Sequence, residues 1–472
     1  MTRVRLSAAL AAMTCILAPA IGSAADDVET LRKELQELRR SYDERVRALE
    51  TRIDQLEVAA SAAESAVAAG VAAPPQQAAV PAPQAGAPAV RGASAFNPAI
   101  SLVLGGNYTN TSQDPETYNL AGFIPSGGEV GPGERSFNLG ESEITLAASV
   151  DPFFSAQLTA AITPEDEIEV EEAFFRATAL PEGFTARGGR FFSGIGYLNE
   201  VHAHAWDFTD QPLVYQAFFG NQLAQDGLQV KWLAPTDLFI EFGVEAGNGQ
   251  AFPGTRRNRN AVNGATLFGH VGGDIGDTAS WRAGASWVDL RADERAYEDV
   301  DDGGNAVLNA FTGKSRTWGV DAVFKWIPAD NTRQQLKVQG EYLRRKETGD
   351  LLFDAEGAAL ADAFHSEQSG WYVQSVWQFN PRWRAGARYD ALDSGDPRIG
   401  LVESGTLPLE AFPTLLPADP DRLSLMLDWS PSEFSRLRAQ YAWDDSRNAG
   451  ERDRQFHLQY LFGIGAHSAH KY

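Results

Sequence analysis

The sequence predicts an all-β transmembrane barrel of about 16 antiparallel strands, preceded by a short coiled-coil helix and a Pro/Ala-rich linker. Three observations predict this fold class. Apolar and polar residues alternate strictly in many segments after residue 97, and short Pro-containing turns alternate with long polar connections. No apolar run near 18 residues follows the N-terminal region, so the sequence predicts no membrane-spanning helix.

Residues 1–25 have the pattern of a secretory signal peptide. Arg3 and Arg5 precede an apolar run over residues 6–21, and small residues follow at 22–25. Cys15 is the only cysteine and lies within the apolar run, so the mature chain is expected to hold no thiol. Disulfides, cysteine–zinc sites and thiol catalysis are therefore excluded.

Two further segments precede the barrel. Residues 27–58 carry apolar residues at alternating spacings of three and four, which is typical of a coiled coil with one stutter between Tyr42 and Val46. About four heptads are marginal alone, so this stalk is expected to associate with copies of itself; a lone solvated helix is the alternative. Residues 59–95 are rich in Ala, Pro and Gln and predict a linker.

Residues 97–472 are predicted to form the barrel. The clearest strand pattern places Trp318, Val320, Ala322, Phe324 and Trp326 on one face, with polar residues between them. Soluble β-sandwiches and β-helices are the rival folds, but they rarely carry Trp and Tyr at both ends of ten-residue strands. The long connections are expected at 109–139, 192–225, 248–262, 290–314, 344–368 and 392–418, and shorter ones at 163–167 and 444–451.

This organisation predicts the location and the partners. Short periplasmic turns and long outer loops indicate the outer membrane of a Gram-negative bacterium, with lipid around the barrel and the stalk in the periplasm. The stalk could reach peptidoglycan or another periplasmic partner. A formal net charge of -23 argues against nucleic acid and anionic membrane surfaces as partners.

Residues 192–225 form the third outer connection and are unusually apolar. They carry Glu200, Asp207 and Asp210 and no Lys or Arg. Such a loop is expected to fold into the barrel and constrict the pore, although packing at a subunit interface is the alternative. The bases expected on the facing lumen wall could create a transverse field or simply solvate the lumen; they include Arg384, Arg388, Arg436 and Arg438.

Histidine is scarce, with 7 in the chain. His202 and His204 form an H-x-H in the third connection, and His467 and His470 form an H-x-x-H near the C-terminus. Imidazoles at such spacings can bind zinc or another transition metal. Solvated or wall-packed histidines are the alternative, and no other cofactor is expected.

No catalytic motif is present, and an enzyme is not expected: there is no G-x-S-x-G, P-loop or H-E-x-x-H. Three functions are compatible with the sequence. The first is a channel for passive diffusion of small hydrophilic solutes or ions. The others are an outer-membrane transition-metal (zinc) uptake protein and a structural protein that tethers the envelope.

The stretch from Val170 to Leu213 resembles the phosphate-selective porin (O/P type) superfamily. The resemblance rests on Gly189, Arg190, Phe191, Gly196 and Glu200, which follow a strand rich in aromatic residues and a Pro/Gly turn. It implies a homotrimer of sixteen-stranded channels with the third loop folded inward. Phosphate members of this family use a Lys- and Arg-rich pore, and the third loop of this chain has no base. The chain also resembles proteins labelled TonB-dependent or zinc-regulated receptors, but it lacks their plug and their strand number.

Overall fold

The computed structural model describes residues 98–465 except 128–129, 164–166, 256–257, 302, 332 and 448–451. All of them belong to one compact unit, Arg91–Tyr472. The predicted signal peptide, coiled coil and linker lie outside the described residues, as do His467 and His470. Within the described ranges, no helix has the length and apolar character needed to cross a membrane.

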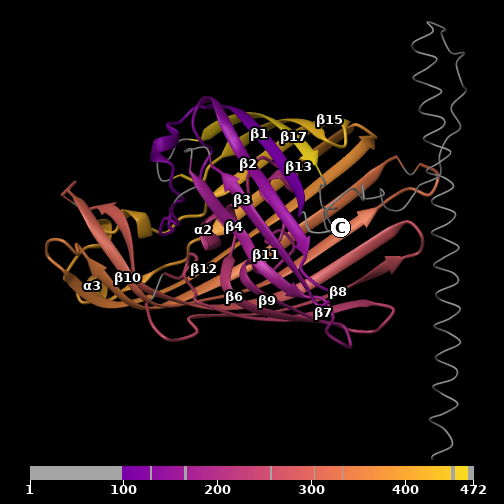
Figure 1. Cartoon of the computed structure of the whole chain (residues 1–472). Helices are drawn as coiled ribbons and strands as arrows, with labels where there is room; N and C mark the ends of the chain where they lie inside the picture. The colour runs from indigo at the N-terminus through magenta and orange to yellow at the C-terminus, as the bar shows by residue number, and fades with distance from the viewer. Residues whose placement is uncertain are drawn as a thin grey trace, which may run out of the picture. The chain divides into compact units, whose positions relative to one another are not determined.

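The described chain forms one antiparallel sheet that closes on itself, since β1 pairs with both β2 and β17 (Figure 1). The sheet has seventeen strands, of which the two-residue β14 (Arg398–Ile399) pairs only with β12. The other sixteen form the barrel, which confirms the predicted fold class. They are β1 (Ala99–Thr111), β2 (Ser136–Ser149), β3 (Phe154–Ile162), β4 (Ile168–Ala177), β5 (Phe184–Phe192), β6 (Ala224–Leu233), β7 (Phe239–Gly247), β8 (Gly264–Ile275), β9 (Ala279–Val300), β10 (Ala306–Trp326), β11 (Gln335–Phe353), β12 (Leu360–Asn380), β13 (Trp383–Asp393), β15 (Asp421–Ser432), β16 (Ser435–Asp444) and β17 (Asp453–Gly465).

The burial of side chains is inverted relative to a water-soluble protein. On β10, Trp318, Val320 and Trp326 are 45%, 48% and 41% exposed, whereas Asp321 between them is buried. Trp318 and Trp326 lie eight residues apart, about 26 Å along the strand. At a tilt of about 35–45°, this length spans about 20 Å of membrane, and the two tryptophan rings then lie near the edges of an apolar band about 25 Å tall. The barrel therefore has a lipid-facing exterior and a polar interior.

Strands β9 to β12 extend well beyond this band, with 22, 21, 19 and 21 residues. The loops expected at 290–314 and 344–368 are therefore wrong, because the connections there span only 301–305 and 354–359. Beyond the apolar band these four strands continue as regular β-structure, but their outward residues are charged. The sequence of this part therefore resembles that of a polar loop.

The inward face of this extension is covered by the long β13–β15 connection. Phe311, Leu351 and Phe364 pack there with Leu401 and Phe412 from that connection. Among the described residues, the helices are η1 (Pro115–Thr117), η2 (Ala203–Ala205), α2 (Leu213–Phe219), α3 (Gly400–Glu403), η3 (Leu409–Ala411) and η4 (Pro413–Leu415).

Candidate functional site

The β5–β6 connection, residues 193–223, folds into the barrel. Its apolar centre forms α2, all seven residues of which are buried. Gly220 ends this helix in the left-handed conformation at φ 61°, which favours glycine as the residue after a helix. The helix packs against inward side chains of four strands, including Val288 on β9, Leu343 on β11 and Tyr372 on β12. Apolar packing on the wall thus holds the loop inside.

The loop reaches opposite sides of the lumen. His202 lies 3.0 Å from the Glu171 carboxylate on β4, and Gln374 on β12 donates to the Asp207 carboxylate at 3.0 Å. β4 and β12 are eight positions apart in the ring of sixteen strands, so they face each other across the barrel. The segment from residue 202 to residue 207 therefore crosses the lumen.

Glu341 on β11 is a central anchor of the loop. Its carboxylate accepts hydrogen bonds from the backbone N–H groups of Tyr197 (3.2 Å) and Leu198 (3.1 Å) and from the Tyr215 hydroxyl (2.8 Å). The turn that brings these donors together depends on Gly196, which has φ 59°. A Cβ atom there would lie 2.1 Å from Oε2 of Glu341, so only glycine fits without a shift.

The three acids predicted from the loop each contact two bases on the barrel wall. The shortest N–O distances are Glu200 to Arg187 (2.5 Å) and Lys231 (3.2 Å), Asp207 to Lys337 (2.5 Å) and Arg384 (3.2 Å), and Asp210 to Arg388 (2.9 Å) and Arg422 (2.8 Å). Burial alone would raise the pKa of Asp207, but Lys337 and Arg384 outweigh burial and lower it to about 2. Asp207 is therefore held as a carboxylate.

The remaining predicted bases also contact the loop. Arg436 donates to the backbone carbonyl of His204, and Arg438 donates to that of Trp206 at 2.6 Å. Arg438 also pairs with Asp428 on β15 at 2.8 Å. The structure thus brings all seven predicted constriction residues to the contact between loop and wall. Arg384, Arg388 and Arg438 form ion pairs, and Arg436 donates to a loop carbonyl. These charges therefore do not face one another across an open lumen.

The predicted histidine pair lies in a cluster with three glutamates. Nδ1 of His202 is 3.0 Å from Glu171 and 3.4 Å from Glu143, and Nε2 is 3.2 Å from Glu172. Nδ1 of His204 is 2.6 Å from the other oxygen of Glu143. Burial would lower the pKa of His202, but hydrogen bonds to the three glutamates raise it well above its usual range.

A β-bulge brings two of these glutamates to one point. The β3–β4 register shifts between Thr159 and Ala160, which leaves Glu171 as an extra residue on β4. Glu171 and Glu172 therefore both reach His202, although consecutive strand residues normally face opposite ways. The sequence analysis did not predict this cluster. The feature that could have indicated it is the pair of adjacent acids, which interrupts the alternation of the strand.

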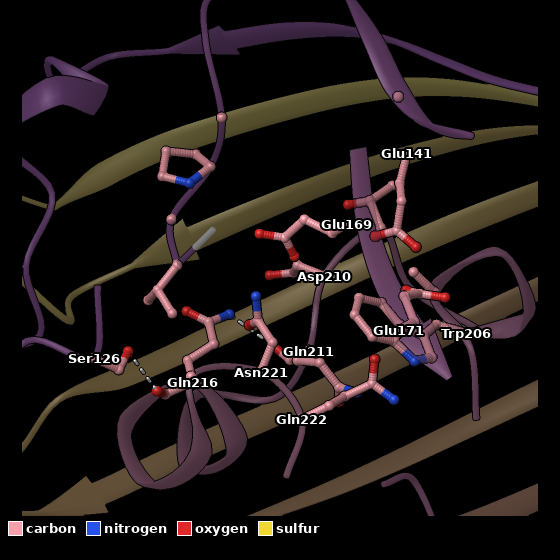
Figure 2. A pocket seen from close by; sticks show the side chains of 18 of the residues that line it. Ser126, Glu141, Glu169, Glu171, Trp206, Asp210, Gln211, Gln216, Asn221 and Gln222 are labelled. Atoms are coloured by element: carbon pink, nitrogen blue, oxygen red, sulfur yellow. Dashed lines mark hydrogen bonds between the residues drawn. The ribbon is translucent and has the colours of Figure 1, made fainter. Parts of the chain in front are cut away.

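A cavity of about 1260 Å³ remains beside the loop, and Figure 2 shows part of its lining. Residues of β1, β2, β4, β5, β6 and β17 line it from the wall, and residues 203–222 line it from the loop. Its bases are Arg135 and Arg190, and Arg190 pairs with Asp226 at 2.7 Å. Its acids are Asp114, Glu116, Glu134, Glu141, Glu169, Glu171, Asp210 and Asp226. Acids thus outnumber bases around the cavity.

The closed sheet, the lipid-facing belt and the polar interior define the chain as a transmembrane β-barrel protein. No family model matches it. It belongs to the same family as an uncharacterized protein of Aquifex aeolicus (strain VF5), which is 31% identical over 406 residues, covering 80% of each chain.

Solved structures with a similar barrel have low sequence identity. OmpT with loop L8 deleted, an outer membrane protein of Vibrio cholerae, has a TM-score of 0.48 and 12% identity over 79% of this chain and 100% of its own. Pseudomonas putida OprB has a TM-score of 0.45 and 12% identity over 78% and 94%. The outer membrane channel DcaP of Acinetobacter baumannii has a TM-score of 0.43 and 12% identity over 77% and 96%. The resemblance to phosphate-selective porins stays a prediction.

Proposed function

We propose that this protein is an outer-membrane channel for passive diffusion of small hydrophilic solutes or ions, in which residues 192–225 constrict the pore. The observation that carries the proposal is the loop that crosses the lumen and leaves an acid-lined cavity against β1, β2, β4, β5, β6 and β17. A sixteen-stranded barrel is wide enough for an aqueous channel, and an inward loop narrows it. Transport then follows the cavity on one side of the loop.

The charges around the cavity favour cations. Three of its eight acids pair with bases, Asp226 with Arg190, Asp210 with Arg388 and Arg422, and Glu171 with His202. The other five acids still outnumber the remaining base of the lining, Arg135. A narrow, low-dielectric passage lined by one sign of charge concentrates counter-ions of the opposite sign. Phosphate selectivity would need an excess of bases, so a cation preference is the better expectation for this pore.

We further propose a homotrimer, as the resemblance to phosphate-selective porins implies, in the outer membrane of a Gram-negative bacterium with the stalk in the periplasm. The tethering alternative depends on residues 27–58, which lie outside the described residues, so nothing in the structure favours it.

Planar-bilayer recording in a KCl gradient tests the proposal, with the reversal potential as the readout. Replacing Glu141 and Glu169 with Gln should move the reversal potential of the channel towards zero. The matched control is E356Q/E410Q, which removes two exposed acids that do not line the cavity. A purified protein that never conducts, or an E141Q/E169Q variant that keeps the cation preference of the wild type, would contradict the proposal.

A second candidate function, transition-metal uptake, is supported by the cluster around His202. One ligand atom each from Glu143, Glu171 and His202 lie within 4.8 Å of one another. The His202–carboxylate distances of 3.0 and 3.4 Å match the ligand–ligand separations around an ion with bonds of about 2.1 Å. Glu172 at the second ring nitrogen would orient the imidazole, as carboxylates commonly do for metal-bound histidines.

Calorimetric titration of the purified protein with Zn²⁺ tests this second function. Wild-type protein and an H365Q control should bind, because His365 lies on β12 outside the cluster. The H202Q and E143Q/E171Q variants should lose at least tenfold in affinity. Equal affinity in all four proteins would remove the metal proposal and leave the channel proposal intact.

A further inference from the structure

The outward face of β9, β10 and β11 carries a basic patch just above the outer aromatic girdle. Trp287 and Trp318 are cross-strand partners at the outer edge of the apolar band, and Trp318 is in turn opposite Arg344. Two residues further out, Arg316 lies opposite Lys346. Below the girdle, the outward residues of β10 from Val320 to Trp326 carry no charge. The basic side chains therefore begin where the apolar band ends.

The patch has an excess of positive charge. Its five exposed bases are Arg291, Lys314, Arg316, Arg344 and Lys346, and the acids beside them are Asp289, Glu367 and Asp393, which leaves a net charge of +2. The whole chain carries -23, so this surface is opposite in sign to the rest of the protein. The net charge of the whole chain argued against anionic membrane surfaces as partners. That argument does not apply to this locally basic surface.

The patch also has the shape of a binding site. A small cleft on the barrel exterior is lined by Trp287, Arg316, Trp318, Arg344, Lys346 and Glu367. Glu367 is within 2.5 Å of Arg344 and 3.1 Å of Lys346, while Arg316 is half exposed and 3.6 Å from its nearest acid. A bound anion would contact bases on two neighbouring strands. A hydrocarbon chain attached to this anion would lie on the tryptophan rings below it.

We propose that this cleft binds the phosphorylated head group of an outer-leaflet lipid, with its acyl chains along Trp318 and Val320. Charge complementarity supports the assignment, because arginine and lysine side chains hold phosphate oxygens by charge-assisted hydrogen bonds. Position supports it as well, since lipid phosphates lie at the level of the aromatic girdle and basic clusters there recognise anionic head groups. The inference is independent of the pore and of the metal cluster.

Titrating the detergent-solubilised full-length protein with bis-phosphorylated lipid A tests the proposal. The R316Q/R344Q/K346Q variant should bind about 25-fold more weakly. Each base near an anionic surface contributes about fivefold in affinity, and Glu367 offsets one of the three. The control R382Q/R398Q/R452Q removes the same charge from exposed positions outside the patch and should bind like the wild type.

The probe lipids separate the possible sources of the anion. Dephosphorylated lipid A should bind the wild-type protein at least tenfold more weakly than the phosphorylated form, and inorganic phosphate should not compete at millimolar concentration. Equal binding of the two lipids, equal losses in both triple variants, or displacement of the lipid by millimolar inorganic phosphate would overturn the proposal. Heat-modifiable migration of the folded barrel on gels verifies that each variant is native.

Discussion

Removing the two central acids of the loop should release it from the wall. Asp207 meets Lys337 on β11 and Arg384 on β13. Asp210 meets Arg388 on β13 and Arg422 on β15. The D207N/D210N variant keeps the size of both side chains and removes only their charge. It should leave the backbone ladder of the barrel intact while weakening the docked position of the loop.

The size of the effect follows from the contacts. Leaving a buried base without its partner costs about 3–5 kcal/mol. The lower value applies here, because Arg384 still contacts Asp428 and Arg388 still contacts Asp390 after the change. Two acids at about 3 kcal/mol each destabilise the docked loop by about 6 kcal/mol, which shifts the equilibrium towards the released loop by about 10⁴-fold.

Single-channel recording measures this shift as a larger unit conductance and as added current noise when the loop moves. The control D393N/D396N removes two exposed acids of the β13–β15 region and should conduct like the wild type. An unchanged conductance in a D207N/D210N protein with native heat-modifiable migration would refute the view that these ion pairs hold the constriction.

Three further predictions test other parts of the structure. The pKa of Asp207 is lowered to about 2, so its contribution to stability is complete above its ordinary value near 3.8 and is lost only as the pH falls towards 2. The difference in conductance between D207N and the wild type should therefore stay constant from pH 7 to about 4.5, and a difference that vanishes within this range would contradict the assignment. The G196A variant should lower the free energy of unfolding in urea by more than G276A: both glycines have φ 59°, but a Cβ atom at Gly196 meets Glu341 whereas one at Gly276 has no neighbour within 4 Å. The V320R substitution, in the apolar band, should make the free energy of folding into lipid vesicles less favourable by about 2–4 kcal/mol, and S369R at the edge of the band by about 0–1 kcal/mol. Equal losses in the two variants would contradict the assigned band.

The barrel could be predicted because the alternation of apolar and polar residues along a strand shows directly which of its faces contacts lipid. The pattern of a segment such as Trp318 to Trp326 is enough to predict a membrane-spanning strand without knowledge of any other part of the chain. The inward fold of the third connection was also accessible, since residues 213–219 are too apolar for an exposed loop and the structure buries all of them.

Other features depend on registers that the sequence does not reveal. The bulge at Glu171 decides that this residue and Glu172 both reach His202, and a single residue shift would turn one of them away. The ion pairs of Asp207 and Asp210 depend on where the loop crosses the lumen. The full length of strands β9 to β12 was not predicted. Beyond the apolar band their outward residues are charged, such as Arg316 and Lys346, and such a sequence resembles that of a loop.

The most direct test of the account is whether the loop lies against the far wall of the barrel. The mature chain is expected to hold no thiol, so the two cysteines of a T209C/Q440C variant can be crosslinked selectively. A short bis-maleimide should join them efficiently, because the Thr209 N–H donates to the Gln440 side chain at 2.8 Å. The comparison pair is Thr145 and Thr159, whose hydroxyls on β2 and β3 are 3.1 Å apart. Crosslinking of both pairs in the folded barrel is the predicted result. Crosslinking of the β2–β3 pair alone would contradict a loop folded across the lumen.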